Sequence, residues 1–505
     1  MAMNRRIFLK TVGMISLGAA LPAVSAPKKR PNILFCISDD QSWCHAGAMG
    51  DPVVKTPAFD RVAREGILFT NAFCNAPSCG PSRSAILTGQ HIWRLEKAGN
   101  LHSTLSAKFA TYTGLLENAG YAVGYTGKGW SPGRLEPGGR TVNPAGPLFI
   151  GRKLKPPFKK MVNNDYAGNF EKFLTQVPGD QPFCFWLGTH EPHRAYELGA
   201  GRKTGKDPAK VVVPPIFPDN DIVRNDILDY MVEIEHFDGM VARAIQVLEA
   251  AGRLDDTIVV LTSDNGMPYP RAKGNLYDFG VRMPLAIQWP AKVAPGRTVD
   301  DFVSLADLAP TFLEAAGLPI PPEMTGRSIM NILLSRRRGR IDPDRDCVFT
   351  ASERITWCRP NGAGYPCRAI RTYRWLYIRN YEPDRWPAGD PTIDADPEGI
   401  YGDVNAGPTK TYMIRHSTDP SVAPLFRLGF AKRPAEELYD VTADPCQLHN
   451  LADDPALAHV KRRLRRRLEQ YQRRTKDPRA EGKNPWDWYP YYWRGRVKWP
   501  VKPHM

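Results

Sequence analysis

The chain has 505 residues, of which 42% are apolar and 24% are charged, and its formal net charge is +15. This composition is typical of a soluble globular enzyme and excludes a disordered, collagen-like or coiled-coil protein. The excess of positive charge favours an anionic partner, such as nucleic acid, a membrane surface or a polyanionic glycan, without choosing among them.

The N-terminus has the pattern of an export signal. Arg5 and Arg6 precede a short apolar stretch over residues 11–24, and two small residues follow it. The stretch is short for a membrane anchor, so we expect a signal peptide of the twin-arginine kind over residues 1–26. Export predicts a bacterial periplasmic or secreted protein and argues against nucleic acid as the partner. No apolar run of about 20 residues follows, which excludes a spanning helix from the mature chain.

Strand and helix patterns alternate after the signal, which predicts an α/β fold with a large mixed, mostly parallel sheet between helices. Strand patterns cover residues 32–38, 122–125, 183–188 and 257–263, and helix patterns cover residues 57–66 and 222–252. The first and last of these strands end directly at carboxylates, Asp39-Asp40 and Asp264. Because sites in open α/β sheets gather at the carboxyl ends of strands, we expect the functional site there.

The alternation fades beyond about residue 340. Short aromatic strands at residues 375–378 and 437–440 predict a small antiparallel sheet, and a basic helix with an apolar face over residues 457–471 follows. We therefore expect a catalytic α/β domain over residues 27–345 and a C-terminal α+β subdomain over residues 346–505. The basic face of the helix is expected to be solvated, and the aromatic tail is expected to pack back on the body.

The nine cysteines are an odd number in a long chain, so at least one is unpaired and a disulfide scaffold is not expected. Cys358 and Cys367 could bridge across a Gly/Pro-rich loop. The cysteines and histidines show no zinc-binding spacing.

The most informative segment runs from Cys79 through Pro81 and Arg83 to Thr88-Gly89. Pro81 can open a helix, and residues four apart share a helix face, so Cys79 and Arg83 are expected to point the same way. A helix N-terminus also stabilises negative charge. Two interpretations remain open from these residues alone: a reactive thiolate held by the arginine, or a buried structural cysteine.

A second group of residues predicts a metal site. Asp39, Asp40 and Asp264 offer carboxylates, Asn265 offers an amide oxygen, and no soft ligand accompanies them. Oxygen ligands select a hard cation, calcium or magnesium, over zinc or copper. Adjacent carboxylates at a strand end repel one another without a counter-ion. The alternative interpretation is a pair of loop caps.

The run Cys79-Gly-Pro-Ser-Arg83 followed by Thr88-Gly89 resembles the signature of type I sulfatases, in the alkaline phosphatase superfamily. Residues 31–40, 56–66, 261–266 and 437–440 resemble further segments of this family, so the resemblance covers nearly all of the mature chain. It implies that a formylglycine-generating enzyme oxidises Cys79 to formylglycine, whose hydrate binds the cation together with Asp39, Asp40, Asp264 and Asn265. It also implies calcium as the cation and a sulfated carbohydrate as the substrate.

The resemblance also implies roles for four other residues. Arg83, Lys128 and Lys273 hold the charge of the sulfate, and His190, which follows a buried strand, protonates the leaving group. His193 is left unassigned. The chain departs from the family at Trp130, where the family has a histidine that steadies the formylglycine hydroxyl. Another group must substitute for that histidine.

Within the family, Asp264 to Pro270, His190 to Arg194 and Tyr365 to Arg368 resemble the heparan N-sulfatase (sulfamidase) branch. Lys273 stands where that branch has an arginine, so the resemblance supports a sulfated glycan more firmly than an N-sulfate. Two alternatives remain: a phosphodiesterase or phosphonate hydrolase of the same superfamily, and an inactive protein that binds sulfated glycans. The sequence predicts no oligomeric state.

Overall fold

The large sheet is built around the buried strand β1 (Asn32–Ser38) in the computed structural model, which describes residues 30–501. Its strand order is β3-β4-β1-β5-β6-β2-β7, and β8 pairs with β2. Strands β3, β4, β1 and β5 are parallel, while β6 runs antiparallel to both β5 and β2. The other strands are β2 (Ile67–Phe73), β3 (Ala122–Gly127), β4 (Phe183–Gly188), β5 (Thr257–Ser263), β6 (Arg282–Gln288), β7 (Arg297–Val299) and β8 (Val303–Ser304). The predicted mixed, mostly parallel sheet is confirmed.

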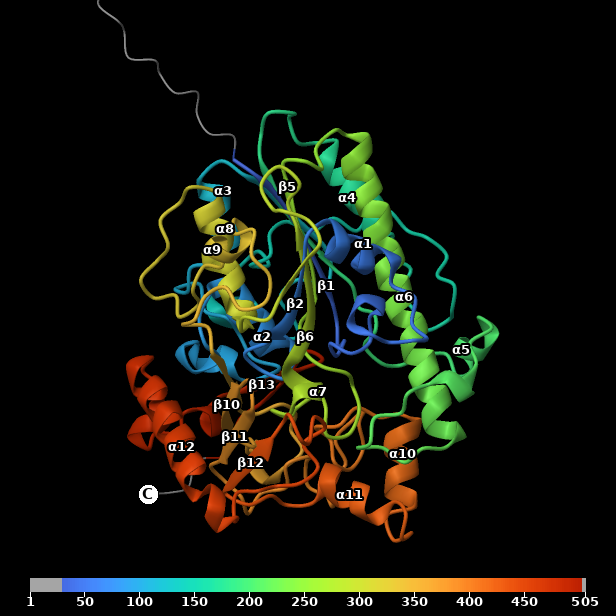
Figure 1. Ribbon diagram of the computed structural model, residues 1–505, viewed down its shortest axis with the longest axis vertical. Helices are drawn as coiled ribbons and strands as arrows, with labels where there is room; N and C mark the ends of the chain where they lie inside the picture. Colours follow the sequence, from blue (N-terminus) through green and yellow to red (C-terminus); the bar gives the residue numbers. More distant parts are fainter. Residues whose placement is uncertain (1–29, 502–505) are drawn as a thin grey trace, which may run out of the picture.

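Helices cover both faces of this sheet (Figure 1). One face carries α1 (Pro57–Glu65), α4 (Tyr166–Leu174) and the long α6 (Asp221–Ala250), with the short α5 (Ala200–Lys203) beside α6. The other face carries α2 (Cys79–Thr88), α3 (Tyr112–Asn118), α8 (Leu308–Ala315) and α9 (Met330–Leu333). The short α7 (Asp278–Val281) leads into β6. Each face of the sheet therefore buries its own apolar core, as a mostly parallel sheet requires.

Helix α1 shows how local sequence and packing agree. Pro57 occupies the first turn, where its missing N–H has no partner to lose, and Phe59 and Val62 are buried against the sheet. The Asp238 carboxylate of α6 accepts hydrogen bonds from the N–H groups of Ala58 (2.9 Å) and Phe59 (2.8 Å). Helix α6 thus caps the start of α1 and ties the two helices together.

A second, four-stranded antiparallel sheet has the order β12-β11-β10-β9. Its strands are β9 (Cys347–Ser352), β10 (Cys367–Thr372), β11 (Trp375–Asn380) and β12 (Glu436–Asp440), and α10 (Pro408–Arg415) and α11 (Ala423–Phe430) lie in the connection before β12. Helix α12 (Ala458–Arg474) packs Val460, Leu464 and Leu468 on this sheet, while Arg463 and Arg466 are exposed. The predicted antiparallel sheet and basic helix are both present.

The aromatic tail packs back on the body through its first half. Trp486 is fully buried, and the Arg354 guanidinium donates hydrogen bonds to the carbonyls of Tyr489 and Pro490, both at 2.8 Å. The tail then forms a hairpin from β13 (Tyr491–Trp493) and β14 (Arg496–Lys498). The Tyr492 N–H donates to the carbonyl of His102 (2.8 Å), which fixes the hairpin beside the loop after α2.

All nine cysteines lie within the described residues and all are free, so the suggested bridge between Cys358 and Cys367 does not form. Within residues 30–501, none of the helices combines the length and the apolar character that a membrane crossing needs. The expected signal over residues 1–26 lies outside the described part of the chain.

Candidate active site

The site forms where four parallel strands end at one edge of the large sheet. Asp39 and Asp40 follow β1, Asp264 and Asn265 follow β5, and Lys128 follows β3. The register pairs the last residues of β1 and β5, Ser38 with Ser263, and those of β3 and β4, Gly127 with Gly188. The strand ends that the sequence marked are therefore neighbours in space.

A buried cluster of potential metal ligands lies at this edge. Ligand atoms of Asp39, Asp40, Cys79 and Asp264 all lie within 4.8 Å of one another, and all four residues are buried. The amide nitrogen of Asn265 donates to Asp40 Oδ1 (2.8 Å), while its oxygen Oδ1 is buried without a hydrogen-bond partner. Such an orphaned oxygen beside three carboxylates fits a hard divalent cation, for which these residues supply an oxygen-rich shell.

Three buried cations balance the three carboxylates. Lys128 pairs with Asp39, Lys273 pairs with Asp40 (2.6 Å), and Arg83 Nε pairs with Asp264 Oδ2 (2.7 Å). The cluster is therefore close to neutral by itself, and a divalent cation would make it positive enough to attract an anionic ester. Burial raises the pKa of Asp264 to about 6 although Arg83 opposes this, whereas Lys128, His193 and Arg83 outweigh burial and hold the pKa of Asp39 well below its usual range.

Cys79 begins α2 and is almost completely buried, with its sulfur 3.3 Å from Asp39 Oδ1. Burial, reinforced by the Asp39 carboxylate, raises the pKa of the Cys79 thiol. Arg83 does not act as a partner for a thiolate, because its guanidinium bonds Asp264 and the carbonyls of Lys128 and Gly129. The reactive-thiolate interpretation therefore loses its physical basis.

The indole of Trp130 is turned into the protein core. Its Nε1 donates to Ser84 Oγ of α2 (2.7 Å), and the side chain is buried. Three histidines line the cavity above Cys79 instead: His102, His190 and His193. The motifs predict His190 at the site and give no signal for His102.

His193 is the histidine that contacts the carboxylate cluster. Its Nε2 lies 3.7 Å from Asp40 Oδ2, and its Nδ1 lies 2.6 Å from the carbonyl oxygen of Arg194. That carbonyl can only accept, so Nδ1 carries the proton and Nε2 faces the cluster. Burial and the neighbouring Lys273 lower the pKa of His193. The ring is thus both oriented and close to the reacting region.

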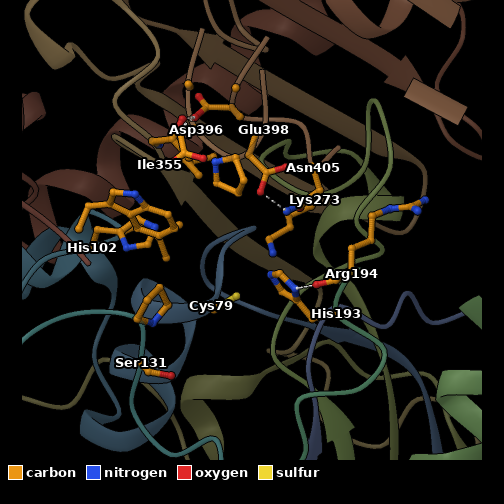
Figure 2. A pocket seen from close by; sticks show the side chains of 18 of the residues that line it. Cys79, His102, Ser131, His193, Arg194, Lys273, Ile355, Asp396, Glu398 and Asn405 are labelled. Carbon is orange, nitrogen blue, oxygen red and sulfur yellow. Dashed lines mark hydrogen bonds between the residues drawn. The ribbon is translucent and has the colours of Figure 1, made fainter. Parts of the chain in front are cut away.

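A cavity of about 610 Å³ opens above the cluster, with Cys79 at its floor (Figure 2). Lys128 and Lys273 line it beside Cys79, whereas Arg83 does not. Its upper wall comes from the C-terminal region, including Ile355 and residues 394–398. Loops at the edge of the large sheet and loops of the C-terminal region therefore build the same cavity, which can hold a ligand of several rings.

Glu233 of α6 provides a pH-dependent stability test. It lines the cavity and is buried, and burial together with Glu191 raises its pKa to about 9. The folded protein thus keeps this proton up to about pH 9, while the unfolded chain loses it near pH 4.3, so the free energy of unfolding falls between these values as pH rises. Glu233→Gln is expected to remove this fall, measured by urea unfolding at pH 5 and pH 8. Equal pH slopes in Glu233→Gln, wild type and the exposed control Glu171→Gln would contradict the assignment.

The fold and the cluster together fit a hydrolase with a candidate metal site. A solved structure of a protein in complex with its substrate D-glucosamine-2-N,6-O-disulfate shares the fold, with a TM-score of 0.65 and 21% identity over 90% of this chain and 100% of the other. The chain belongs to the sulfatase family, since the family model described as Sulfatase matches residues 31–318. The model described as N-sulphoglucosamine sulphohydrolase, C-terminal, matches residues 272–413.

Two curated relatives extend over most of the chain. The human N-sulphoglucosamine sulphohydrolase is 29% identical over 512 residues, covering 91% of this chain and 93% of the relative. An ulvan-active sulfatase of Formosa agariphila is 27% identical over 463 residues, covering 90% and 82%. The chain is thus a sulfatase, and the resemblance inferred from its motifs is confirmed.

Proposed function

We propose that this sulfatase releases sulfate from a sulfated carbohydrate, with N-sulfated glucosamine as the preferred sugar, by means of a formylglycine formed at Cys79 and a bound calcium ion. The observation that carries the proposal is the buried Cys79 thiol, which lies against carboxylates in a metal-ligand cluster at the cavity floor. The match of residues 272–413 to the N-sulphoglucosamine sulphohydrolase C-terminal model supports the choice of sugar. Lys273 and Trp130, which depart from the sulfamidase pattern, weigh toward an O-sulfate.

Conversion of Cys79 to formylglycine is consistent with the surroundings of its thiol. A raised thiol pKa suits a residue that acts after modification rather than as a thiolate. A formylglycine hydrate would supply a hydroxyl nucleophile, and calcium would polarise the sulfate oxygens as a Lewis acid. A formylglycine-generating enzyme is therefore a required partner. The export signal is proposed to deliver the mature protein to the periplasm or beyond.

The cationic residues divide into two roles. Lys128 and Lys273 line the cavity and can bind the sulfate once a metal ion takes over their carboxylates. Arg83 is fully buried and bonds Asp264, so it positions a metal ligand rather than touching the substrate. The two lysines and a bound cation would thus place positive charge around the sulfur atom, where negative charge develops during transfer.

Sulfate release from defined sugars tests the proposal. The chain is coexpressed with a formylglycine-generating enzyme and offered glucosamine N-sulfate, O-sulfated glucosamine, O-sulfated galactose, an aryl sulfate and an aryl phosphate diester. We expect release from glucosamine N-sulfate and slow turnover of the phosphate diester. Release from O-sulfated sugars alone overturns the N-sulfate assignment, and faster cleavage of the diester overturns the sulfatase assignment. Binding of sulfated sugars without release by the matured protein would favour a binding protein.

The leaving group requires a proton, and the geometry favours His193 over His190 as its donor. Because Nδ1 of His193 is held by the Arg194 carbonyl, the donor is the imidazolium form, which gives up its second proton from Nε2, the nitrogen that faces Asp40. Both histidines line the cavity, but His193 has a hydrogen bond that orients its ring and lies against the cluster. His193→Ala is expected to slow sugar desulfation by about 10²–10⁴-fold, and an activated aryl sulfate much less, because a phenolate leaves without help. The measurement is kcat/KM for both substrates. The same pattern in His190→Ala, with little change in His193→Ala, would return the role to His190.

A further inference from the structure

The hairpin of β13 and β14 forms one side of the cavity mouth. Tyr491, Trp493, Arg496 and Lys498 line the cavity, and all of β14 is exposed, whereas Cys79 at the floor is nearly inaccessible. The hairpin is joined to the body by the hydrogen bond from the Tyr492 N–H to the His102 carbonyl and by an exposed ion pair from Arg494 to Asp396. These contacts fix the hairpin at the mouth of the cavity.

Of the three cationic side chains on the hairpin, one has an ion-pair partner and two have none among the described residues. Arg494 at the turn pairs with Asp396 Oδ2 at 3.1 Å. Arg496 and Lys498 have no carboxylate partner among residues 30–501, although both face the cavity. Lys498 Nζ lies 5.6 Å from the centre of the Trp357 ring. Two cations with open hydrogen-bonding capacity thus stand at the entrance to a site for anionic esters.

Aromatic rings connect these cations to the floor. Trp357 lies 5.9 Å from Tyr491, and the ring of His102 packs edge-on against Tyr491 (5.0 Å) and Trp493 (4.6 Å). Flat aromatic surfaces in a concave site offer large apolar contact to the C–H face of a sugar ring, at little cost in side-chain entropy.

The segment that meets the hairpin turn, residues 394–398, is acidic, and two of its carboxylates are already engaged. Asp396 pairs with Arg494, and Glu398 accepts a hydrogen bond from Asn405 Nδ2 (3.1 Å). Asp394 of the same segment also lines the cavity. An anionic group on the ligand is repelled by this segment and attracted by Arg496 and Lys498, so the charge distribution favours one position for a charged ligand.

We propose that the β13–β14 hairpin forms a second sugar subsite, in which Arg496 and Lys498 bind a carboxylate or sulfate on the sugar next to the one that loses sulfate. The proposal rests on the proposed function and names its substrate class more narrowly. The substrate is an acidic oligosaccharide of at least two sugars, such as a uronic acid joined to a sulfated amino sugar.

The test compares two substrates: the sulfated sugar that the enzyme hydrolyses best, offered alone and offered joined to a uronic acid. The quantity measured is the kcat/KM of the joined substrate divided by the kcat/KM of the single sugar. We expect this ratio to fall at least tenfold in the double variant Arg496→Ala/Lys498→Ala, and further in Arg496→Glu/Lys498→Glu, because charge-assisted hydrogen bonds to the acidic group are lost. The control Arg463→Ala/Arg466→Ala removes two exposed charges from α12, outside the cavity, and should keep the wild-type ratio.

An unchanged ratio in the Arg496/Lys498 variants overturns the subsite, and this includes the case in which kcat/KM falls equally for both substrates. If the wild-type protein releases sulfate from neither substrate, the proposed function fails, and the subsite is then decided by binding. Calorimetric titration of the acidic disaccharide should show a Kd at least tenfold weaker for Arg496→Ala/Lys498→Ala than for wild type. Equal Kd values would overturn the subsite independently of any turnover.

Discussion

Cys79→Ala is expected to abolish sulfate release while leaving the protein folded. The proposed chemistry has no other nucleophile at the cavity floor, so the loss should exceed about 10⁴-fold, as when the nucleophile of a hydrolase is removed. The thiol makes only a weak contact with Asp39 at 3.3 Å. Its removal should cost about 1 kcal/mol of unfolding free energy, typical of a single substitution. The substitution is therefore expected to remove activity while changing the free energy of unfolding only slightly.

Mass spectrometry identifies the chemical form of residue 79 in the active protein. The peptide containing Cys79 from active wild-type protein should carry an aldehyde in place of the thiol. Cys74→Ala is the matched control, because Cys74 is equally buried and lies five residues upstream, outside the cavity lining. It should keep the wild-type rate. An intact thiol at Cys79 in fully active protein would disprove the formylglycine mechanism.

The parts of the site that follow from strand ends could be predicted from the sequence. Strands β4 and β5 begin and end at the predicted residues, 183–188 and 257–263, because each contains an unbroken apolar run, at 183–187 and 258–261, as a strand buried on both faces does. A parallel sheet gathers such ends at one edge. This rule alone brings Asp39 and Asp264 together across more than two hundred positions of sequence.

The residues that the sequence did not predict depend on long-range packing. His102 reaches the cavity from a loop where its own φ is 51°, and the tail hairpin, almost four hundred residues later, fixes that loop. No periodicity encodes such a contact. Arg83 shares a helix with Cys79 as its spacing predicts, yet its guanidinium bonds Asp264, which follows strand β5 and is far from Arg83 in the sequence. Local spacing therefore predicts the face of a helix but not the partner of a side chain.

Asp264 decides whether the cluster holds a cation, and the choice of substitution matters. Alanine would leave Arg83 buried and unpaired, which costs about 3–5 kcal/mol and would confound metal loss with unfolding. Asparagine keeps the shape and one oxygen but removes the charge. Asp264→Asn is therefore expected to weaken calcium binding by at least about 10²-fold and to lower the rate at least as much, since a charged ligand of a hard cation is lost. Calorimetric titration of metal-free protein and the melting temperature with and without calcium measure the effect.

The pH dependence of calcium binding provides a second test of the role of Asp264. With its pKa raised to about 6 by burial, metal-free Asp264 holds a proton below that pH, and the proton competes with the cation. Calcium affinity of the wild type should therefore fall as pH drops from 7 to 5, whereas Asp264→Asn should lack this step. Asp477→Asn is the matched control, because Asp477 is equally buried and pairs with Arg368 Nε at the same 2.7 Å, outside the cluster. It should lose stability but keep calcium affinity. Wild-type calcium affinity in Asp264→Asn, or full activity of metal-free protein, would show that this cluster is not the metal site.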